Sequence, residues 1–134
     1  MAQMTIQLEQ VSSTTTEAMV RAHRVLIDRP VDKGGTDLGP MGGELFLAAI
    51  GGCLMSNLLA AIRARNSDVS EVRTTVIGTI ASAPARFSVV EVHLEAKGSS
   101  EEIQRLVEIA DRGCIMMNTL RGRFEVSIRT RVGV

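Results

Sequence analysis

The residues of this sequence best able to carry out chemistry are its two cysteines. Cys53 lies within an uncharged run of 18 residues from Leu45 to Ile62, in the stretch AAIGGCLMSN, and Cys114 lies far downstream in DRGCIMMNTL. A thiolate can be oxidised to a sulfenic acid, and two thiols can close a disulfide where their Cα atoms come within about 7 Å. These residue types therefore raise the hypothesis of a redox-active pair, provided that the fold brings the thiols together.

Helical spacing directs Cys114 towards the protein core. It lies four residues after Ala110 and three before Met117, on the apolar face of an expected helix. The run that carries Cys53 is the most apolar segment of the chain, so both thiols should face one interior. Free cysteines are, however, usually buried as small apolar groups and are then inert. The pattern alone therefore allows two roles for the cysteines, as packing residues of the core or as a redox pair.

A thiol that attacks a peroxide needs a nearby cation, because burial among apolar groups alone raises the pKa of a thiol. The candidates are Arg21, Arg24 and Arg29, which precede the apolar run, and we favour Arg24 and Arg29. A solvated surface position is the alternative interpretation of each arginine.

The dipeptide Gly51-Gly52 directly precedes Cys53 and is unusual inside a helix. Two glycines there cost about 2 kcal/mol relative to alanine, so a close neighbour is expected: a backbone, a ligand or tight packing. Two further hypotheses follow. The chain could be a binding module that holds a small hydrophobic ligand near these glycines, or a structural domain with two inert thiols.

Composition excludes several classes of function. The chain has 15 basic and 15 acidic residues, three Phe and no Trp or Tyr, so it lacks the basic surface and the aromatic platforms of a nucleic-acid-binding protein. Two cysteines and two histidines without paired spacing do not suggest a zinc site. The start, MAQMTIQLEQ, lacks the features of a secretory signal, which predicts a cytoplasmic protein with reduced thiols.

The uncharged run also reaches the lower length limit of a membrane-spanning segment. It contains Gly51, Gly52, Ser56 and Asn57, and a helix that is apolar all round is equally typical of a helix wrapped by sheets. We therefore expect a buried central helix and no membrane insertion. One chain of 134 residues has little left to cover such a helix on every side, which predicts a homodimer.

Hydrophobic periodicity predicts an α+β fold in a single domain over residues 1–134, with the order strand, strand, long helix, strand, strand, helix, strand. The expected strands are residues 4–11, 17–27, 69–81, 87–96 and 124–132. A loop rich in glycine and proline precedes the long helix, which should run from near Glu44 to between Arg63 and Asn66. The second helix should follow a capping box of Ser99 and Glu102 and stop at Gly122.

These residues resemble the OsmC/Ohr family of organic hydroperoxide reductases. The resemblance rests on HRVLIDRPVDKGGTDLGPMGGELFLAAIGGCLMSNL and DRGCIMMNTL, and extends from about residue 17 to the end of the chain. The matching features are an aspartate, a proline, a Gly-Gly, a Gly-Pro, a Glu-Leu, two small residues and two cysteines: Asp28, Pro30, Gly34-Gly35, Gly39-Pro40, Glu44-Leu45, Ala48-Ala49, Cys53 and Cys114.

The resemblance implies a thiol peroxidase with an OsmC-like fold, in which antiparallel sheets pack around a long central helix. Cys53 would attack the peroxide and become a sulfenic acid, and Cys114 would condense with it to a disulfide. A thiol reductant, in some members dihydrolipoamide, would then restore the pair. Family members are intertwined homodimers with their sites at the subunit interface, and they need no metal or organic cofactor.

The sequence departs from the family pattern close to the site. The family's catalytic glutamate stands ten residues before the first cysteine, where this chain has Gly43. Glu44 stands nine residues before Cys53, a turn of about 180° on a continuous helix, so it would face away from the thiol. Gly42 and Ile115 replace two family prolines. We therefore expect Glu44 to act chiefly on the N-terminus of the helix.

Overall fold

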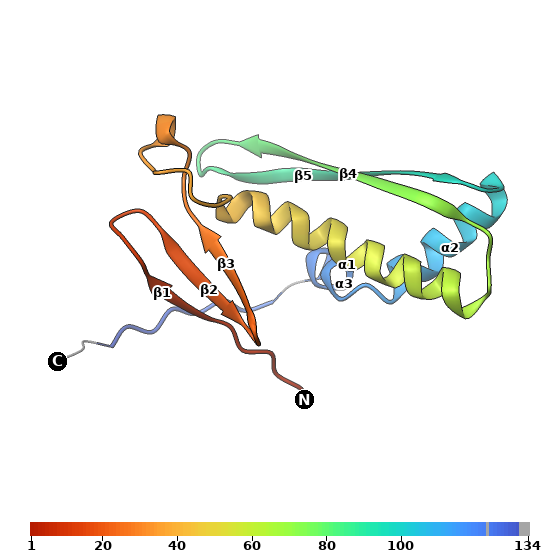
Figure 1. Cartoon of the computed structure of the whole chain (residues 1–134), viewed down its shortest axis with the longest axis horizontal. Coiled ribbons are helices and arrows are strands. Elements are labelled where there is room, and N and C mark those ends of the chain that lie inside the picture. Colours follow the sequence, from red (N-terminus) through yellow and green to blue (C-terminus); the bar gives the residue numbers. More distant parts are fainter. Residues whose placement is uncertain (123, 132–134) are drawn as a thin grey trace. The chain divides into compact units, whose positions relative to one another are not determined.

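The computed structural model describes residues 1–122 and 124–131 (Figure 1). It has an α+β architecture with antiparallel sheets and a long helix, as the sequence predicts. The chain divides into two compact units, residues 1–48 and the part from Ala49 onward. The long helix, α1 (Gly42–Ala64), begins in the first unit and ends in the second. That both units form one domain stays a prediction.

The first unit contains a three-stranded antiparallel sheet with the strands, in spatial order, β1 (Gln7–Gln10), β2 (Thr16–Val20) and β3 (His23–Ile27). The prediction of one strand over residues 17–27 is wrong, because the chain reverses in its middle. Val20 pairs with His23, which leaves Arg21 and Ala22 as a two-residue turn, with Arg21 left-handed at a φ of 54°. This turn lacks the Gly, Asn or Asp that marks most two-residue hairpins in a sequence.

The loop after β3 is organised around the buried carboxylate of Asp28. This carboxylate accepts hydrogen bonds from two hydroxyls and three backbone N–H groups, which belong to Thr15, Arg29, Thr36 and Leu38. The Thr36 hydroxyl contributes most to holding the pKa of Asp28 well below its usual range, and the remaining donors help to outweigh burial, which raises it. One ionised side chain therefore joins the segment before β2, the end of β3 and the loop.

Two glycines of this loop let it pass close to the end of β3. A Cβ atom at Gly35 would lie 2.0 Å from the carbonyl oxygen of Arg29, and one at Gly39 would lie 2.0 Å from that of Leu26. Any side chain at these positions would push the loop away from the strand. A short 3-10 helix, η1 (Val31–Lys33), lies within the loop.

The first turn of α1 is capped by its own glutamate. The carboxylate of Glu44 accepts a hydrogen bond from the backbone N–H of Met41, with an N···O distance of 2.8 Å, which is half of a capping box. A basic residue, Arg63, lies in the last turn of the helix, where it suits the negative end of the helix dipole, and Asn66 after the helix adopts a left-handed φ of 48°. The predicted helix is confirmed, with its start at Gly42 instead of Glu44.

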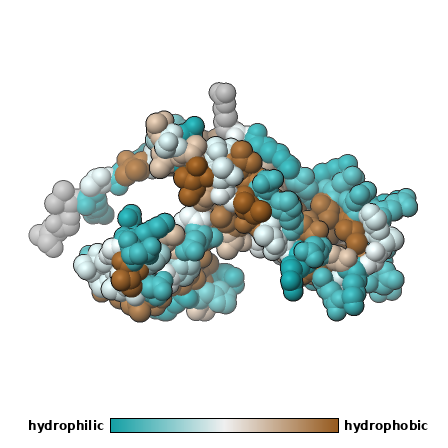
Figure 2. All heavy atoms as spheres, turned by 90° about the horizontal axis from the view of Figure 1, so that it is seen from above, coloured by the Kyte–Doolittle hydropathy of each residue, from teal (hydrophilic) through white to brown (hydrophobic). Residues whose placement is uncertain are grey.

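Within one chain, α1 buries a stripe and not its whole circumference. The buried residues recur mostly every three or four positions: Ile50, Gly51, Leu54, Leu58 and Ala61. The prediction of a helix buried all round is therefore right for one face only, and Leu59 on another face is 42% exposed. By length and composition alone α1 could cross a membrane, and three residues of its buried stripe, Leu54, Leu58 and Ala61, pack into a core cluster. Hydrophobic residues also reach the surface (Figure 2).

The second unit contains a long antiparallel hairpin, β4 (Ser70–Ala81) and β5 (Arg86–Lys97), which confirms the predicted pair of strands. The hairpin runs alongside the part of α1 that belongs to this unit (Figure 1). The core of the second unit contains residues of α1, the residue directly before β4, and residues of the helical region after the hairpin: Leu54, Leu58, Ala61, Val69, Leu106, Ala110 and Cys114.

The predicted second helix is two helices, α2 (Ser100–Arg112) and α3 (Ile115–Arg121). The Ser99 hydroxyl accepts a hydrogen bond from the N–H of Glu102 at 3.2 Å, so the predicted cap of α2 is confirmed. The expectation of one helix reaching Gly122 is wrong, because Gly113 ends α2 and Cys114 is the N-cap residue of α3. We call residues 113–114 the corner.

The predicted last strand is also wrong for the residues that the structure describes. Residues 124–131 form no strand, and Val132 lies outside the described residues. The alternating apolar side chains of Phe124, Val126 and Ile128 are 66%, 76% and 91% exposed. The pattern that predicted a strand is therefore present, but this segment pairs with no other described strand.

Candidate active site

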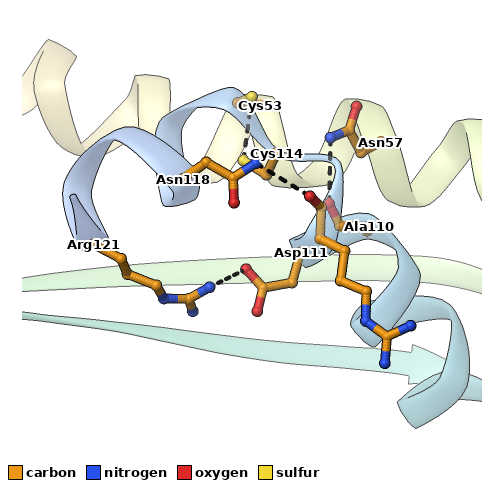
Figure 3. Close-up of polar contacts among 8 residues, drawn as sticks. Cys53, Asn57, Ala110, Asp111, Cys114, Asn118 and Arg121 are labelled. Atoms are coloured by element: carbon orange, nitrogen blue, oxygen red, sulfur yellow. Dashed lines mark hydrogen bonds and ion pairs between the residues drawn. The ribbon is translucent and has the colours of Figure 1, made fainter.

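The structure brings Cys53 and Cys114 into direct contact (Figure 3). Cys53 comes from the middle of α1 and Cys114 from the corner between α2 and α3, and their sulfur atoms lie 3.3 Å apart. Both are free thiols. The Cys114 thiol donates a hydrogen bond to the Cys53 sulfur. The expectation that the fold brings the two thiols into one interior is therefore confirmed for their placement.

The two thiols differ in exposure. Cys114 has no exposed surface, whereas Cys53 is half-buried, so reagents reach Cys53 more easily. Met116 and Met117, from the first turn of α3, pack with Cys53 against the same core cluster. The site is therefore an apolar one with a single partly open sulfur.

The two thiols also differ in acidity. Burial is the largest influence on Cys53 and raises its pKa, but the N–H of Met116, the Cys114 thiol and the N–H of Ile115 together outweigh it and lower the pKa overall. A sulfur that accepts these hydrogen bonds is stabilised as the thiolate. Cys53 is consequently the better nucleophile of the pair.

Cys114 shifts in the opposite direction. Burial raises its pKa most, the N–H of Met117 opposes this, and the neighbouring Cys53 sulfur raises the pKa further, so the overall shift is upward. Cys53 therefore loses its proton before Cys114 does, and the proton that the pair keeps resides on Cys114. This matches the hydrogen bond, in which Cys114 is the donor.

Asn57 fastens the end of α2 to α1 beside the thiols. It lies four residues after Cys53, on the same face of α1, and its Nδ2 donates to the carbonyl oxygen of Ala110 at 3.3 Å (Figure 3). The same amide nitrogen would be 3.8 Å from a Cβ atom at Gly113. The sequence does not predict this role. The available signal was an amide placed one helical turn after a cysteine in an otherwise apolar run.

A second tie closes the corner from the side of α3. Arg121, the last residue of α3, forms an ion pair with Asp111 in the last turn of α2, with an N···O distance of 2.8 Å (Figure 3). The hydrogen bond and the charge of Asp111 raise the pKa of Arg121, and the charge of Cys114 adds a smaller effect. Asn118 adds a hydrogen bond from its Nδ2 to the carbonyl oxygen of Arg112 at 3.1 Å. The sequence gives no sign of these contacts, because they depend on the break at the corner.

The other predicted site residues all lie in the first unit. Arg24 forms an ion pair with Glu17 on the neighbouring strand. Arg29 follows Asp28 and lines an open pocket of about 430 Å³ together with Lys33 and the first residues of α1. Glu44 caps α1, as predicted. The groups that lower the pKa of Cys53 are neutral, so an arginine partner, Arg24 or Arg29, stays a prediction.

The glycine pair before Cys53 has two different environments. A Cβ atom at Gly51 would lie 2.9 Å from a methyl group of Val76 on β4, whereas one at Gly52 would meet nothing within 4 Å. Of the explanations considered for the pair, tight packing therefore applies to Gly51. It lets α1 lie close to the hairpin next to the reactive thiol.

Metal chemistry has no candidate site in residues 1–122 and 124–131. Among these, no group of three or more His, Cys, Asp or Glu side chains is arranged to hold a metal ion.

Solved structures of several bacterial proteins share this fold. An OsmC-like protein from Mycoplasma pneumoniae has 17% sequence identity and a TM-score of 0.77, with 90% of this chain and 89% of that chain covered. An organic hydroperoxide resistance protein from Elizabethkingia anophelis has 23% sequence identity and a TM-score of 0.69, with 90% of this chain and 91% of that chain covered. An organic hydroperoxide resistance protein from Legionella pneumophila has 18% sequence identity and a TM-score of 0.65, with 90% of each chain covered. At these identities the likeness establishes the fold alone, and no curated protein sequence matches the chain.

The family itself is decided by the sequence match. The model of the family described as OsmC-like protein matches residues 34–129, which hold α1, the hairpin, α2, α3 and both cysteines. Since this match covers most of the sequence and the fold agrees with it, the chain belongs to the OsmC-like protein family.

Proposed function

We propose that this protein is a thiol-dependent peroxidase that reduces organic hydroperoxides, or hydrogen peroxide, with Cys53 as the attacking thiol and Cys114 as the resolving thiol. The observation that carries the proposal is the 3.3 Å contact between two free thiols whose pKa values shift in opposite directions. The names of the Elizabethkingia and Legionella proteins support organic hydroperoxides as the substrate class.

In the first step, the Cys53 thiolate attacks one oxygen of the peroxide. A sulfur–oxygen bond forms, the oxygen–oxygen bond breaks, and the leaving alkoxide takes a proton to become the alcohol. The lowered pKa of Cys53 increases the fraction of thiolate at neutral pH. The apolar surroundings favour alkyl peroxides over hydrogen peroxide, since burying the alkyl group contributes roughly 25 cal/mol per Å².

In the second step, Cys114 attacks the sulfur of the Cys53 sulfenic acid. A disulfide forms and the oxygen leaves as water, with the Cys114 proton. Because the sulfurs already touch, this step needs little movement of the backbone. A thiol reductant then reduces the disulfide by two exchange reactions, which returns both cysteines to thiols.

The proposal includes a cytoplasmic homodimer. Leu59 on α1 and the alternating apolar side chains of residues 124–131 are exposed in the single chain, and a second copy would cover them. In that assembly we assign the cation beside the Cys53 thiolate to Arg24 or Arg29. Light scattering at micromolar concentration should give twice the chain mass of 14.4 kDa, and a stable monomer would contradict this part.

Mass spectrometry of the reduced protein after one equivalent of an organic hydroperoxide tests the catalytic part. The expected product has lost two hydrogens, and peptide mapping should place the new bond between Cys53 and Cys114. If both thiols stay free and alkylatable, the peroxidase proposal is wrong. The chain would then be a member of the family that binds a small hydrophobic ligand.

A further inference from the structure

The corner that carries Cys114 is held in place by several polar contacts, among them the hydrogen bond from Asn118 to the carbonyl oxygen of Arg112. Asn57 ties the end of α2 to α1, and the ion pair of Asp111 with Arg121 ties α2 to α3. The backbone N–H of Cys114 adds a bond to the carbonyl oxygen of Asp111 at 3.1 Å. These contacts lie at or within a few residues of the corner, in the second unit (Figure 3).

The contacts are individually weak. The hydrogen bond from Asn57 is long, at 3.3 Å, and the Arg121 side chain is 63% exposed. An exposed ion pair contributes roughly 0.2–1 kcal/mol, so its loss changes an equilibrium by no more than about five-fold. Cys114 also packs in the core cluster, and each polar tie adds to the balance between this closed form of the corner and a locally opened one.

We propose that Asn57 and the Asp111–Arg121 ion pair are positioning groups that hold the corner closed, so that Cys114 traps the oxidised Cys53 before a second peroxide reacts with it. This inference rests on the proposed function. In this inference, three residues outside the thiol pair determine which reaction consumes the sulfenic acid.

Two reactions compete for the Cys53 sulfenic acid. In the closed form, Cys114 displaces its oxygen as water and the disulfide forms. In the open form, the sulfenic sulfur is oxidised by a second peroxide to the sulfinic acid, with release of one alcohol. The ratio of sulfinic acid to disulfide at a fixed peroxide concentration therefore follows the ratio of open to closed corner.

The test compares variants that remove one tie each. Asn57→Leu removes the donor to Ala110 with a side chain of the same branching and number of heavy atoms, and Arg121→Gln removes the ion pair. At a fixed excess of organic hydroperoxide, the ratio of sulfinic acid to disulfide should rise about two- to five-fold for Arg121→Gln and about two- to ten-fold for Asn57→Leu. Quantitative mass spectrometry distinguishes the gain of two oxygens from the loss of two hydrogens. Arg121→Lys, which keeps the charge, should restore most of the wild-type ratio.

A matched control removes a hydrogen bond at the far end of the same helix pair. Ser67, just after α1, donates to Glu102 of α2 at 2.8 Å, so Ser67→Ala lowers stability without touching the corner. Its product ratio should equal that of the wild type. A ratio that rises equally in Ser67→Ala and Arg121→Gln would show that general loss of stability is responsible, and the inference would be wrong.

A second measurement does not depend on peroxide chemistry. Equilibration with a glutathione redox buffer gives the effective concentration of Cys114 at Cys53, which should fall by the same factors in Asn57→Leu and Arg121→Gln. If this constant shifts but peroxide forms no disulfide, the positioning groups are right and the peroxidase proposal fails. If peroxide forms the disulfide but neither the product ratio nor this constant changes in the variants, only the positioning inference fails.

Discussion

Asp28 and Cys53 are both stabilised as anions by neutral donors, yet their surroundings leave them with opposite capacities to react. Asp28 is buried and accepts five hydrogen bonds from hydroxyls and backbone N–H groups, so both its oxygens are occupied. Cys53 is half-buried, and one of its donors, the Cys114 thiol, can become its bonding partner. Asp28 is a structural anion because fixed hydrogen-bond donors occupy both its oxygens. Cys53 is a reactive anion because its sulfur is partly accessible and one of its donors can form a bond with it.

The largest expected effect removes the reactive anion. Cys53→Ser should lower peroxide turnover by more than about 10³-fold, because a serine hydroxyl is not ionised near neutral pH. Consumption of an organic hydroperoxide in the presence of a dithiol reductant measures this loss.

Cys114→Ser is the matched control for that substitution. It should retain the first attack and leave Cys53 as a sulfenic acid, which a second equivalent of peroxide converts to the sulfinic acid. Equal loss of the first attack in both variants would show that the assignment of roles to the two thiols is wrong.

The next effect concerns the structural anion. Asp28→Asn should destabilise the first unit strongly, because an amide cannot accept from all five donors and places its own N–H groups against some of them. The thermal midpoint should fall by several degrees. Asp32→Asn, in the exposed short 3-10 helix of the same loop, should leave the midpoint within experimental error.

The pH dependence of stability separates the charge of Asp28 from its packing. The pKa of Asp28 is lower in the folded state than in the unfolded chain, so its contribution is complete above the unfolded value of about 3.9. It should be lost progressively as the pH falls below that value towards the folded pKa. Urea titrations between pH 2 and 6 should show this loss in the wild type and a smaller one in Asp28→Asn. Parallel curves for the two proteins would contradict the role of the charge.

The sequence predicted much of the second unit and less of its connections. Strong periodicity located α1, the hairpin and the start of α2, since each is long enough for its pattern to be unambiguous. The turn at Arg21 and the break at Gly113 were missed. Both interrupt an apolar pattern that continues on each side, so periodicity carries no signal of the interruption.

The candidate site was predictable in its thiols and not in their surroundings. Apolar spacing and the family resemblance both indicated Cys53 and Cys114. The N–H groups of Ile115 and Met116 that lower the pKa of Cys53 are backbone atoms, which any residue type supplies, so no sequence pattern marks them. The ties from Asn57 and Arg121 depend on helices that meet only in the folded chain.

A substitution next to Cys53 tests how closely α1 packs against β4, with a smaller expected effect than the substitutions above. Gly51→Ala adds a methyl group 2.9 Å from a Val76 methyl, and the branched Val76 side chain has little freedom to move aside. Overpacking costs roughly 1–3 kcal/mol, which exceeds the gain of about 1 kcal/mol in helix propensity.

Gly52→Ala is the matched control, because its methyl group meets nothing within 4 Å. It should raise the free energy of unfolding by about 1 kcal/mol in chemical denaturation. The two adjacent substitutions should therefore have opposite signs. Equal signs would mean that α1 does not approach β4 as closely as the structure has it.

The smallest expected effect lies at Glu44, an exposed carboxylate that contrasts with Asp28. Its one described hydrogen bond comes from the N–H of Met41, and it lies in the first turn of α1, where a negative charge is worth about 0.3–1 kcal/mol. Glu44→Gln keeps an acceptor oxygen for Met41 and removes only the charge. The free energy of unfolding should fall by no more than that amount, and the rate of peroxide reduction should change by only a few-fold. A thousand-fold loss of rate without loss of stability would make Glu44 catalytic. Asp28 and Glu44 would then differ because Glu44 takes part in the reaction, and not because fewer fixed donors surround it.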